Sequence, residues 1–258
     1  MNNILGTLDE SQIAVDLGCG GGSFNYMAHR CRILGIDVTL DQSRLKRNGS
    51  RIDYVQSTSA EIPLCANSVD AVICNHTLEH FHHYENTLRE IGRILKPKGL
   101  LWISVPNGFG FEDALYRMLY SGGGHVNRFT FQSMVDAVQN ATDLVLIQSN
   151  RLYSGFVYLT ALHHYRTVFV LNGGTRIIDK LLGTQLSLYG WGFVFARAVT
   201  QLDPLDSYFN VCCSCGSGDP ISTLKSSGRI RRRLGFRLYE CSNCRQTNVL
   251  IEPPSGVL

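Results

Sequence analysis

The chain has 258 residues, of which 44% are hydrophobic and 17% charged, and its formal net charge is +3. This length suits one domain of ordinary size together with something smaller. No run of about 18 apolar residues lacks charged or polar side chains, which argues against a transmembrane helix. The first residues lack the basic and apolar regions of a signal peptide. We therefore expect a cytoplasmic protein whose nine cysteines are thiols or metal ligands.

Strands and helices are predicted to alternate over the first hundred residues. A strand at 13–17 leads into the glycine-rich turn 16–22, and a helix is expected after Gly22. Further strands are expected at 33–37, 52–56, 69–74 and 100–105, with helices at 41–47 and around 88–95. Proline and glycine at 96–99 end the second of these helices. This alternation predicts parallel strands joined by crossover helices.

The pattern loosens after the fifth strand. Helices are predicted at 111–120, 131–140 and 176–182, and two more strands at 144–147 and 191–198. The fold class is therefore α/β, with a doubly wound, Rossmann-like and mostly parallel seven-stranded sheet over residues 1–200. Residues 201–210 are expected to form a linker, and 211–258 a small zinc-ribbon β domain.

The glycine-rich turn and the acid after it indicate a nucleotide-like ligand. Asp37 ends the second strand, where a carboxylate binds ribose hydroxyls in doubly wound sheets. Glycines in the first turn let the backbone press against such a ligand. Without that spacing, the glycines would equally suit a plain strand-to-helix turn.

Two Cys-x-x-Cys pairs lie near the C-terminus, with 25 residues between them. Such pairs form a tetrahedral thiolate site for structural zinc, and each pair suits the tip of a hairpin. A segment of this size builds little core, so the metal would hold it together. Cys213 is an alternative ligand with poorer spacing. The predicted zinc ligands are Cys212, Cys215, Cys241 and Cys244.

The basic excess of the chain lies in this C-terminal segment. From Val211 onward seven basic residues face three acidic ones, a balance of +4, whereas the first 210 residues have a balance of −1. An arginine-rich run beside Phe236 suits RNA phosphates, and a solvated hairpin is the alternative. The arginines concerned are Arg229, Arg231, Arg232, Arg233 and Arg237.

Several motifs together resemble the class I S-adenosylmethionine-dependent methyltransferase domain of the type 11 sort. The Asp-x-Gly-x-Gly-x-Gly turn at 16–22 matches its first motif, 75–80 its fourth-strand motif, and 94–100 its Leu-Lys-Pro-Gly-Gly turn. Residues 125–130 resemble a segment of relatives that methylate sugars and other small molecules. The resemblance implies S-adenosylmethionine as cofactor, bound by Asp16, Gly18, Gly20, Gly22, Asp37, Ser59 and Asn75.

The chain departs from that family at two places. Thr58 stands where the family usually has an acid facing the adenine. The chain also begins almost at its first strand, where relatives carry a helix that often closes over the cofactor. Either the site is unusually open, or another element, such as a protein partner, covers its N-terminal side.

His80 and His125 are the candidate catalytic bases. An oxygen acceptor must lose its proton, and a histidine titrates near neutral pH. Both residues are expected in loops at the carboxyl ends of strands, where open α/β sheets bind ligands. A structural or solvent-facing histidine is the alternative for each. The group His76, His80, His82 and His83 also admits a metal site, although it lacks clean ligand spacing.

Three functions remain open from the sequence. The first is O-methylation of a small molecule or of a sugar unit in a glycan, which fits residues 125–130 and the aromatic-rich stretch 152–171. The second is RNA methylation, with the basic ribbon holding the RNA. The third is a catalytically weak, methyltransferase-like scaffold whose ribbon docks another chain.

Overall fold

The computed structural model describes residues 2–40, 52–121, 124–153, 155–160, 165–197, 208–233 and 235–252. The chain divides into two compact units, each built from three segments. Unit 1 contains Met1–Val105, Gly124–Ser149 and Gly192–Leu205, and unit 2 contains Pro106–Gly123, Asn150–Trp191 and Asp206–Leu258. The predicted helix at 41–47 and most of the predicted linker, 201–207, lie outside the described residues.

Unit 1 is built on five parallel strands in the order β3-β2-β1-β4-β5. Their bounds are Ile13–Leu17 for β1, Arg32–Asp37 for β2, Ile52–Gln56 for β3, Val69–Asn75 for β4 and Leu95–Pro106 for β5. Because β1 pairs with β2 on one side and with β4 on the other, the strand order reverses at β1. In open α/β sheets, ligands bind at the carboxyl ends of the strands beside such a reversal.

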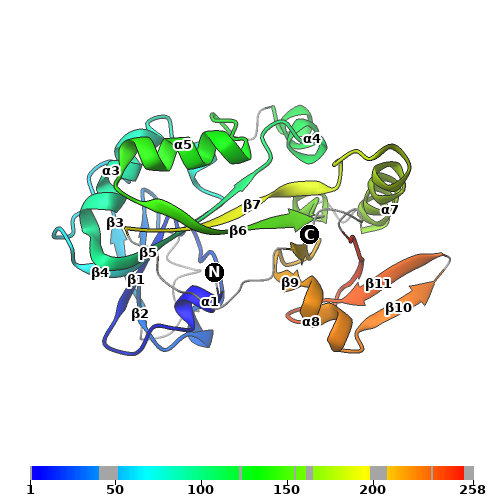
Figure 1. Ribbon diagram of the computed structural model, residues 1–258, viewed down its shortest axis with the longest axis horizontal. Helices are drawn as coiled ribbons and strands as arrows, with labels where there is room; N and C mark the ends of the chain where they lie inside the picture. Colours follow the sequence, from blue (N-terminus) through cyan, green and yellow to red (C-terminus); the bar gives the residue numbers. More distant parts are fainter. Residues whose placement is uncertain are drawn as a thin grey trace. The chain divides into compact units, whose positions relative to one another are not determined.

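Helices cover this sheet with apolar faces. In α3 (Tyr84–Ile94) the buried residues Thr87, Leu88, Ile91 and Ile94 follow helical spacing. In unit 1, α3 packs beside α5 (Phe131–Ala141), as Figure 1 shows. Ile4 and Leu5 of the short helix α1 (Asn2–Leu5) are buried in a core cluster with strand residues such as Ala14.

Over the described residues the large sheet has nine strands, so the expectation of seven mostly parallel strands is corrected. Its order is β3-β2-β1-β4-β5-β7-β6-β8-β9, where β6 is Val145–Tyr153 and β7 is Leu188–Ala196. The two additional strands are β8 (Tyr208–Val211) and β9 (Gly218–Pro220), which pair with each other antiparallel and make the sheet mixed. The sheet grows because β8 pairs parallel with the end of β6, Arg151 opposite Tyr208.

The helix predicted after Gly22 is wrong. The segment from the glycine turn to β2 contains a single 3-10 turn, η1 (Tyr26–Ala28). The backbone N–H and hydroxyl of Ser23 and the hydroxyl of Tyr26 all donate to the carboxylate of Asp16. These local bonds compete with a regular helix, as serine and asparagine commonly do.

The fifth strand begins earlier than the sequence indicates. The helix α3 ends before Leu95, as the proline after Lys96 predicts. The strand β5 nevertheless starts at Leu95, which pairs with Val69, and a bulge precedes the pairing of Ala71 with Leu100. The bulge accommodates proline and glycine, which a regular central strand tolerates poorly.

Unit 2 contains helices and a second sheet. Its helices are α4 (Phe111–Leu119), α6 (Val157–Thr160), α7 (Tyr165–Leu182) and α8 (Ile221–Ser226). Its second sheet has three strands, β10 (Ile230–Arg233), β11 (Phe236–Glu240) and β12 (Thr247–Val249). Within the described ranges, no helix is long and apolar enough to cross a membrane.

Helix α7 is longer than the predicted 176–182 and continues through Gly173 and Gly174. A Cβ atom at Gly173 would lie 3.1 Å from the ring of Phe236, so the glycine lets that ring approach the helix. The rings of Phe169 and Phe236 have centroids 6.0 Å apart. Glycine therefore serves close packing here, and periodicity alone does not reveal this.

A carboxylic acid is buried in unit 2. Glu112, in the first turn of α4, is 4% exposed and accepts a hydrogen bond from the backbone N–H of Phe156. Burial raises the pKa of Glu112 to about 8. The native state therefore keeps the proton over a pH range in which the unfolded chain, with a glutamate pKa of about 4.3, has lost it.

Stability is expected to fall as pH rises through this range. Since the unfolded state binds fewer protons, the free energy of unfolding decreases by about 2 kcal/mol between pH 6 and pH 8. Glu112→Gln keeps the hydrogen-bond acceptor for Phe156 and should make the urea midpoint depend much less on pH in this interval; the raised pKa of Asp16 leaves a smaller dependence near pH 6. Glu85→Gln, in the first turn of α3 but exposed, is the matched control and should behave like the wild type. Equal pH dependence in the two variants would contradict the prediction.

Candidate functional site

The glycine-rich turn lies at the carboxyl end of β1, beside the reversal of strand order. Gly18, Gly20 and Gly22 have φ angles of +72°, +50° and +109°, which L side chains rarely adopt. A Cβ atom at Gly18 would lie 2.0 Å from Cγ2 of Thr77, whereas one at Gly20 would meet no atom within 4 Å. Gly18 is therefore required for packing inside the protein, and Gly20 leaves its backbone open to an approaching ligand.

Asp16 holds this turn in place through hydrogen bonds. Its carboxylate is fully buried and accepts hydrogen bonds from the Ser23 N–H (3.2 Å), the Ser23 hydroxyl (2.9 Å) and the Tyr26 hydroxyl. Burial raises the pKa of Asp16 to about 6, against the opposing effect of these bonds. The structure thus places Asp16 where it shapes the turn.

Asp37 is joined directly to the glycine turn. Its Oδ2 accepts a hydrogen bond from the Gly20 N–H at 2.7 Å, and its Oδ1 accepts one from the Thr39 N–H at 3.0 Å. The side chain is half-buried at the end of β2. A carboxylate has about four lone-pair positions, so both oxygens retain room to accept hydroxyl protons from a ligand. Two features 17 residues apart in sequence therefore form one cradle.

The other two predicted cofactor residues have side chains engaged in internal bonds. Ser59 shares a 2.8 Å hydrogen bond with Thr87 of α3. Asn75 accepts a hydrogen bond from the Ser104 hydroxyl at 2.6 Å and donates one to the Ser23 carbonyl at 3.4 Å. Asn75 thereby ties the ends of β4 and β5 to the glycine turn.

The two candidate bases lie together. His80 belongs to the 3-10 turn η2 (Leu78–His80) after β4, and its ring centroid is 4.8 Å from that of His125. Nδ1 of His80 lies 3.0 Å from the Gly124 carbonyl oxygen. The N–H groups of Val126 and Asn127 donate to the carbonyl of Glu79. These bonds hold the segment that carries His125 against η2.

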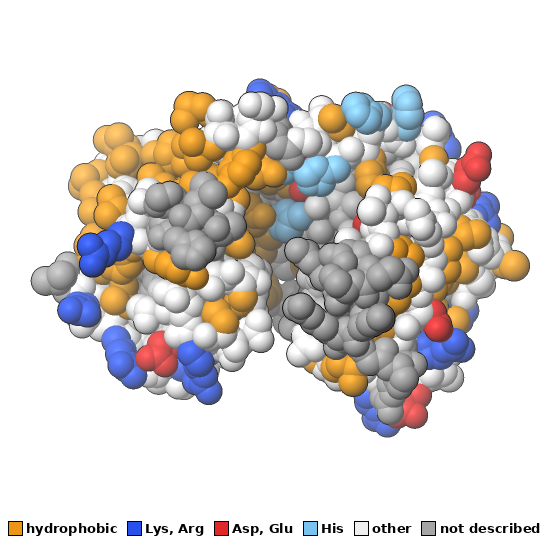
Figure 2. All heavy atoms as spheres, turned by 180° about the vertical axis from the view of Figure 1, so that it is seen from behind, with side chains coloured by type: hydrophobic (Ala, Val, Ile, Leu, Met, Phe, Trp, Pro, Cys, Tyr) orange, Lys and Arg blue, Asp and Glu red, His pale blue; other side chains and the backbone are white. Residues whose placement is uncertain are grey.

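Glu79, which lies in the motif at 75–80, is not among the site residues predicted from the sequence, where its position indicates only a local structural role. Its side chain is 2% exposed, Oε1 lies 3.6 Å from Nδ1 of His76, and Oε2 has no hydrogen-bond partner among the described residues. One ligand atom each from Glu79, His80 and His125 lie within 4.8 Å of one another. Histidine side chains gather on the face of the molecule shown in Figure 2. The pairing with His125 is a tertiary contact that no local spacing indicates.

The four predicted zinc ligands meet in unit 2. Sulfur atoms of Cys212 and Cys244 are 3.6 Å apart, those of Cys215 and Cys241 are 3.7 Å apart, and all four lie within 4.8 Å of one another. Four thiolates about 2.3 Å from one zinc ion in a tetrahedron would be separated by about 3.8 Å. The donor set therefore fits zinc in type, number and spacing.

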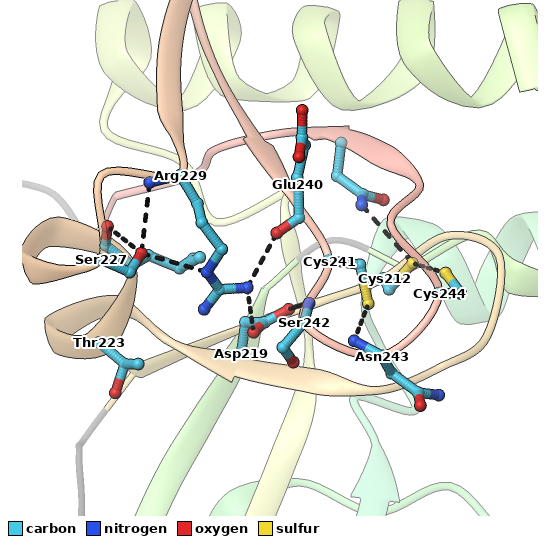
Figure 3. Close-up of polar contacts among 12 residues, drawn as sticks. Cys212, Asp219, Thr223, Ser227, Arg229, Glu240, Cys241, Ser242, Asn243 and Cys244 are labelled. Atoms are coloured by element: carbon cyan, nitrogen blue, oxygen red, sulfur yellow. Dashed lines mark hydrogen bonds and ion pairs between the residues drawn. The ribbon is translucent and has the colours of Figure 1, made fainter.

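Each cysteine pair occupies a hairpin tip, as predicted. Residues 212–217 connect β8 to β9, and 241–246 connect β11 to β12. Backbone N–H groups point at sulfur in both. The Ser214 N–H lies 3.4 Å from the Cys212 sulfur, and the Asn243 N–H lies 3.4 Å from the Cys241 sulfur (Figure 3). Such bonds stabilise thiolate charge, which a metal-bound cysteine carries.

The two hairpin tips differ at one equivalent position. Gly216 (φ +69°) and Arg245 (φ +63°) each follow the second cysteine of their pair, and both adopt a left-handed conformation. Arg245→Gly is expected to raise the free energy of unfolding by about 1 kcal/mol, since it relieves strain that an L side chain incurs there. Gly216→Arg should lower it by a similar amount. Urea unfolding of zinc-loaded protein checks both, and shifts of the same sign would contradict the prediction.

Most of the basic run is engaged with acids. Arg229 bonds Asp219 at 3.1 Å and the Glu240 carbonyl at 2.9 Å (Figure 3), and Asp219 is 2% exposed. Arg231 pairs with the Glu240 carboxylate and Arg237 with Glu252. The other two, Arg232 and Arg233 of β10, are exposed and have no ion pair with a described residue.

Comparison with known proteins agrees with the geometry of unit 1. Residues 15–103 match the family described as "Methyltransferase domain". This segment runs from β1 to the middle of β5 and contains the glycine turn, Asp37, Asn75 and His80. The likeness to this family concerns that segment, about a third of the chain.

Particular relatives match the same part of the chain. An uncharacterized protein of Methanocaldococcus jannaschii is 34% identical over 95 residues, which are 37% of this chain and 41% of that protein. A ubiquinone biosynthesis O-methyltransferase of Azorhizobium caulinodans is 29% identical over 100 residues, covering 36% and 40% respectively. The chain thus spans about two fifths of the length of these curated relatives.

A solved structure extends the likeness in fold. A chain of the complex that contains the Trm112 methyltransferase activator of Haloferax volcanii superposes with a TM-score of 0.56 at 17% identity. The match covers 76% of this chain and 86% of that chain. At this identity the likeness establishes the fold.

Proposed function

We propose that this chain is an S-adenosylmethionine-dependent methyltransferase that O-methylates a small molecule or a sugar unit of a glycan. The observation that carries the proposal is the bond between Gly20 and Asp37, which joins the glycine turn to the acid at the strand reversal. This cradle lies inside the segment that matches a methyltransferase domain. Its open glycine and its incompletely used carboxylate suit a nucleoside with two ribose hydroxyls.

The chain's own residues would divide the binding of S-adenosylmethionine among them. Asp37 accepts hydrogen bonds from the ribose hydroxyls, and the turn at Gly18, Gly20 and Gly22 admits the methionine portion. Asp16 and Asn75 support that turn through Ser23 and Tyr26. With its hydroxyl bound to Thr87, Ser59 would contribute mainly through its backbone.

When bound, the cofactor supplies a methyl group already activated on a sulfonium sulfur. The acceptor oxygen forms the new C–O bond as the C–S bond breaks, and the acceptor loses one proton. The protein's main task is to align the acceptor with the methyl group and to assist removal of that proton. His80 and His125, which lie together at the carboxyl end of β4, are the residues proposed for this step.

Zinc is proposed as a structural ion of the C-terminal segment, held by Cys212, Cys215, Cys241 and Cys244. Four thiolates complete the tetrahedron and leave no position for a substrate. The domain division proposed from the sequence, 1–200 and 211–258 around the linker 201–210, treats this module as a domain of its own, whereas the compact units group 106–123 and 150–191 with it. Its first strand, β8, takes up Tyr208–Asn210 at the end of the proposed linker.

RNA methylation is a second candidate function. Arg232 and Arg233 favour it, because these two exposed arginines, which form no ion pair with a described residue, stand next to each other on β10. The ion pairs of Arg229, Arg231 and Arg237 reduce the charge available for phosphates.

A protein partner over the N-terminal side is a further proposal. The Haloferax complex, in which a related fold occurs with an activator protein, supports it.

Transfer of labelled methyl from S-adenosylmethionine into fractionated cell extract tests the function. We expect label in a ribonuclease-resistant glycan or small-molecule fraction with the wild type, and far less with Asp37→Ala at the same cofactor concentration. Label that ribonuclease removes, and that Arg232→Ala/Arg233→Ala lowers, would establish the RNA alternative. Failure of the wild type to bind S-adenosylmethionine would favour the scaffold.

A further inference from the structure

A buried carboxylate oxygen in unit 1 lacks a partner. The Glu79 side chain is 2% exposed, and no described group forms a hydrogen bond with its Oε2. Taking a carboxylate oxygen out of water without a replacement bond is costly, and buried polar atoms nearly always have partners. A cation beside Oε2 would supply the missing interaction.

Two imidazoles lie close to the same carboxyl group. One ligand atom each from Glu79, His80 and His125 are within 4.8 Å of one another. Two histidines and one carboxylate form a donor set typical of first-row transition metals. Imidazole nitrogen and carboxylate oxygen are harder ligands than the four thiolates in unit 2, so the two sites differ in the metals they favour.

The surroundings of His80 match those of a metal ligand. Its Nδ1 lies 3.0 Å from the Gly124 carbonyl oxygen, and a neutral imidazole that donates there keeps its lone pair on Nε2. Metal-binding histidines usually donate their other ring N–H to a carbonyl or carboxylate. The bond also fixes the orientation of the ring.

The three residues are held in place before any ion arrives. His125 belongs to a segment whose next two N–H groups, from Val126 and Asn127, donate to the Glu79 carbonyl at 2.8 and 3.0 Å. The Asn127 side chain donates to the carbonyls of Leu78 and Phe81. Glu79 is buried, His125 is half-buried and His80 is exposed, so the cluster is open on one side.

We propose that Glu79, His80 and His125 bind one divalent first-row transition-metal ion, which keeps open positions for an oxygen ligand. The role of the ion rests on the proposed function. An acceptor hydroxyl bound to it would lose its proton to water more readily, as metal-bound water does. The two histidines would then act as ligands, with the ion promoting the deprotonation proposed for them above.

Zinc content measured by elemental mass spectrometry tests the binding. The full chain is dialysed against micromolar Zn²⁺ and then against metal-free buffer without a chelator. We expect Glu79→Gln, His80→Ala and His125→Ala each to hold one zinc per chain fewer than the wild type. His82→Ala and His83→Ala remove exposed histidines that lie outside the cluster, and they should keep the wild-type content. The comparison is a difference, so the zinc held by the cysteines cancels.

Equal zinc content in the wild type and all three cluster variants would overturn the proposal. Added Zn²⁺ should also raise the melting temperature of the wild type more than that of His80→Ala, a substitution at an exposed position that spares the core. Binding of S-adenosylmethionine is measured on the same samples. If the wild type failed to bind S-adenosylmethionine, the proposed function would be overturned. If the wild type bound it normally and held more zinc than the cluster variants, both proposals would be upheld.

Discussion

Asp37→Ala is expected to weaken S-adenosylmethionine binding on the order of 100-fold or more, since hydrogen bonds to a charged group contribute about 1.5–3 kcal/mol each. The substitution removes the acceptor for two ribose hydroxyls. It also releases the Gly20 N–H, which Asp37 holds at 2.7 Å, and so loosens the turn that the ligand approaches. Isothermal titration calorimetry measures the change in Kd.

Two further variants separate these effects. Asp37→Asn keeps one acceptor oxygen and nearly the same shape, so its loss should be smaller than that of alanine. Asp53→Ala removes an exposed aspartate on the neighbouring strand β3, which pairs only weakly with Arg32 across 3.4 Å. Asp53→Ala should bind like the wild type. Equal affinity of Asp37→Ala and Asp53→Ala would show that the nucleoside does not lie in this cradle.

Cys241→Ser is expected to abolish tight zinc binding and unfold the C-terminal part of unit 2. Structural zinc contributes apparent free energies of about 10–16 kcal/mol in zinc-finger peptides, and small zinc modules do not fold without it. Zinc binds cysteine as the thiolate and displaces the thiol proton, so affinity should increase with pH. Zinc content and circular dichroism melting measure the loss.

Other cysteines provide the controls. Cys65→Ser alters an exposed thiol in unit 1 and should change neither zinc content nor melting. Cys213→Ser tests the alternative ligand; since Cys213 is not in the four-sulfur cluster, zinc should remain. If Cys241→Ser retained stoichiometric zinc and melted like the wild type, the four-thiolate assignment would be wrong.

The sequence predicts the elements whose signal is local. The strand 13–17 and the helix ending before Leu95 are observed, because a buried apolar run and a proline act on their own neighbours. The helix predicted after Gly22 does not form, because the carboxylate of Asp16 in β1 accepts the hydrogen bonds that Ser23 and Tyr26 donate. The addition of β8 and β9 to the sheet cannot be predicted from local patterns, because the pairing of β8 with β6 joins residues far apart in the chain.

The same contrast applies to the sites. The cysteine pairs were found because metal ligands repeat at fixed spacing within one short segment. His80 and His125 were singled out separately, and their contact depends on backbone bonds between Glu79 and residues 126–127. The sequence does not place Glu79 in the site, because the burial of its Oε2 without a hydrogen-bond partner depends on the fold and on no motif.

Because β8 pairs with β6, the zinc site also protects the end of β6 from becoming an exposed sheet edge. Tyr208–Asn210 cover the backbone of Arg151–Tyr153, and β8 leads directly to the first cysteine pair. If zinc loss detached β8, unsatisfied N–H and C=O groups at the end of β6 would become a template for strands of other molecules. Metal depletion is therefore expected to produce aggregation, visible as light scattering, before it produces a soluble unfolded tail.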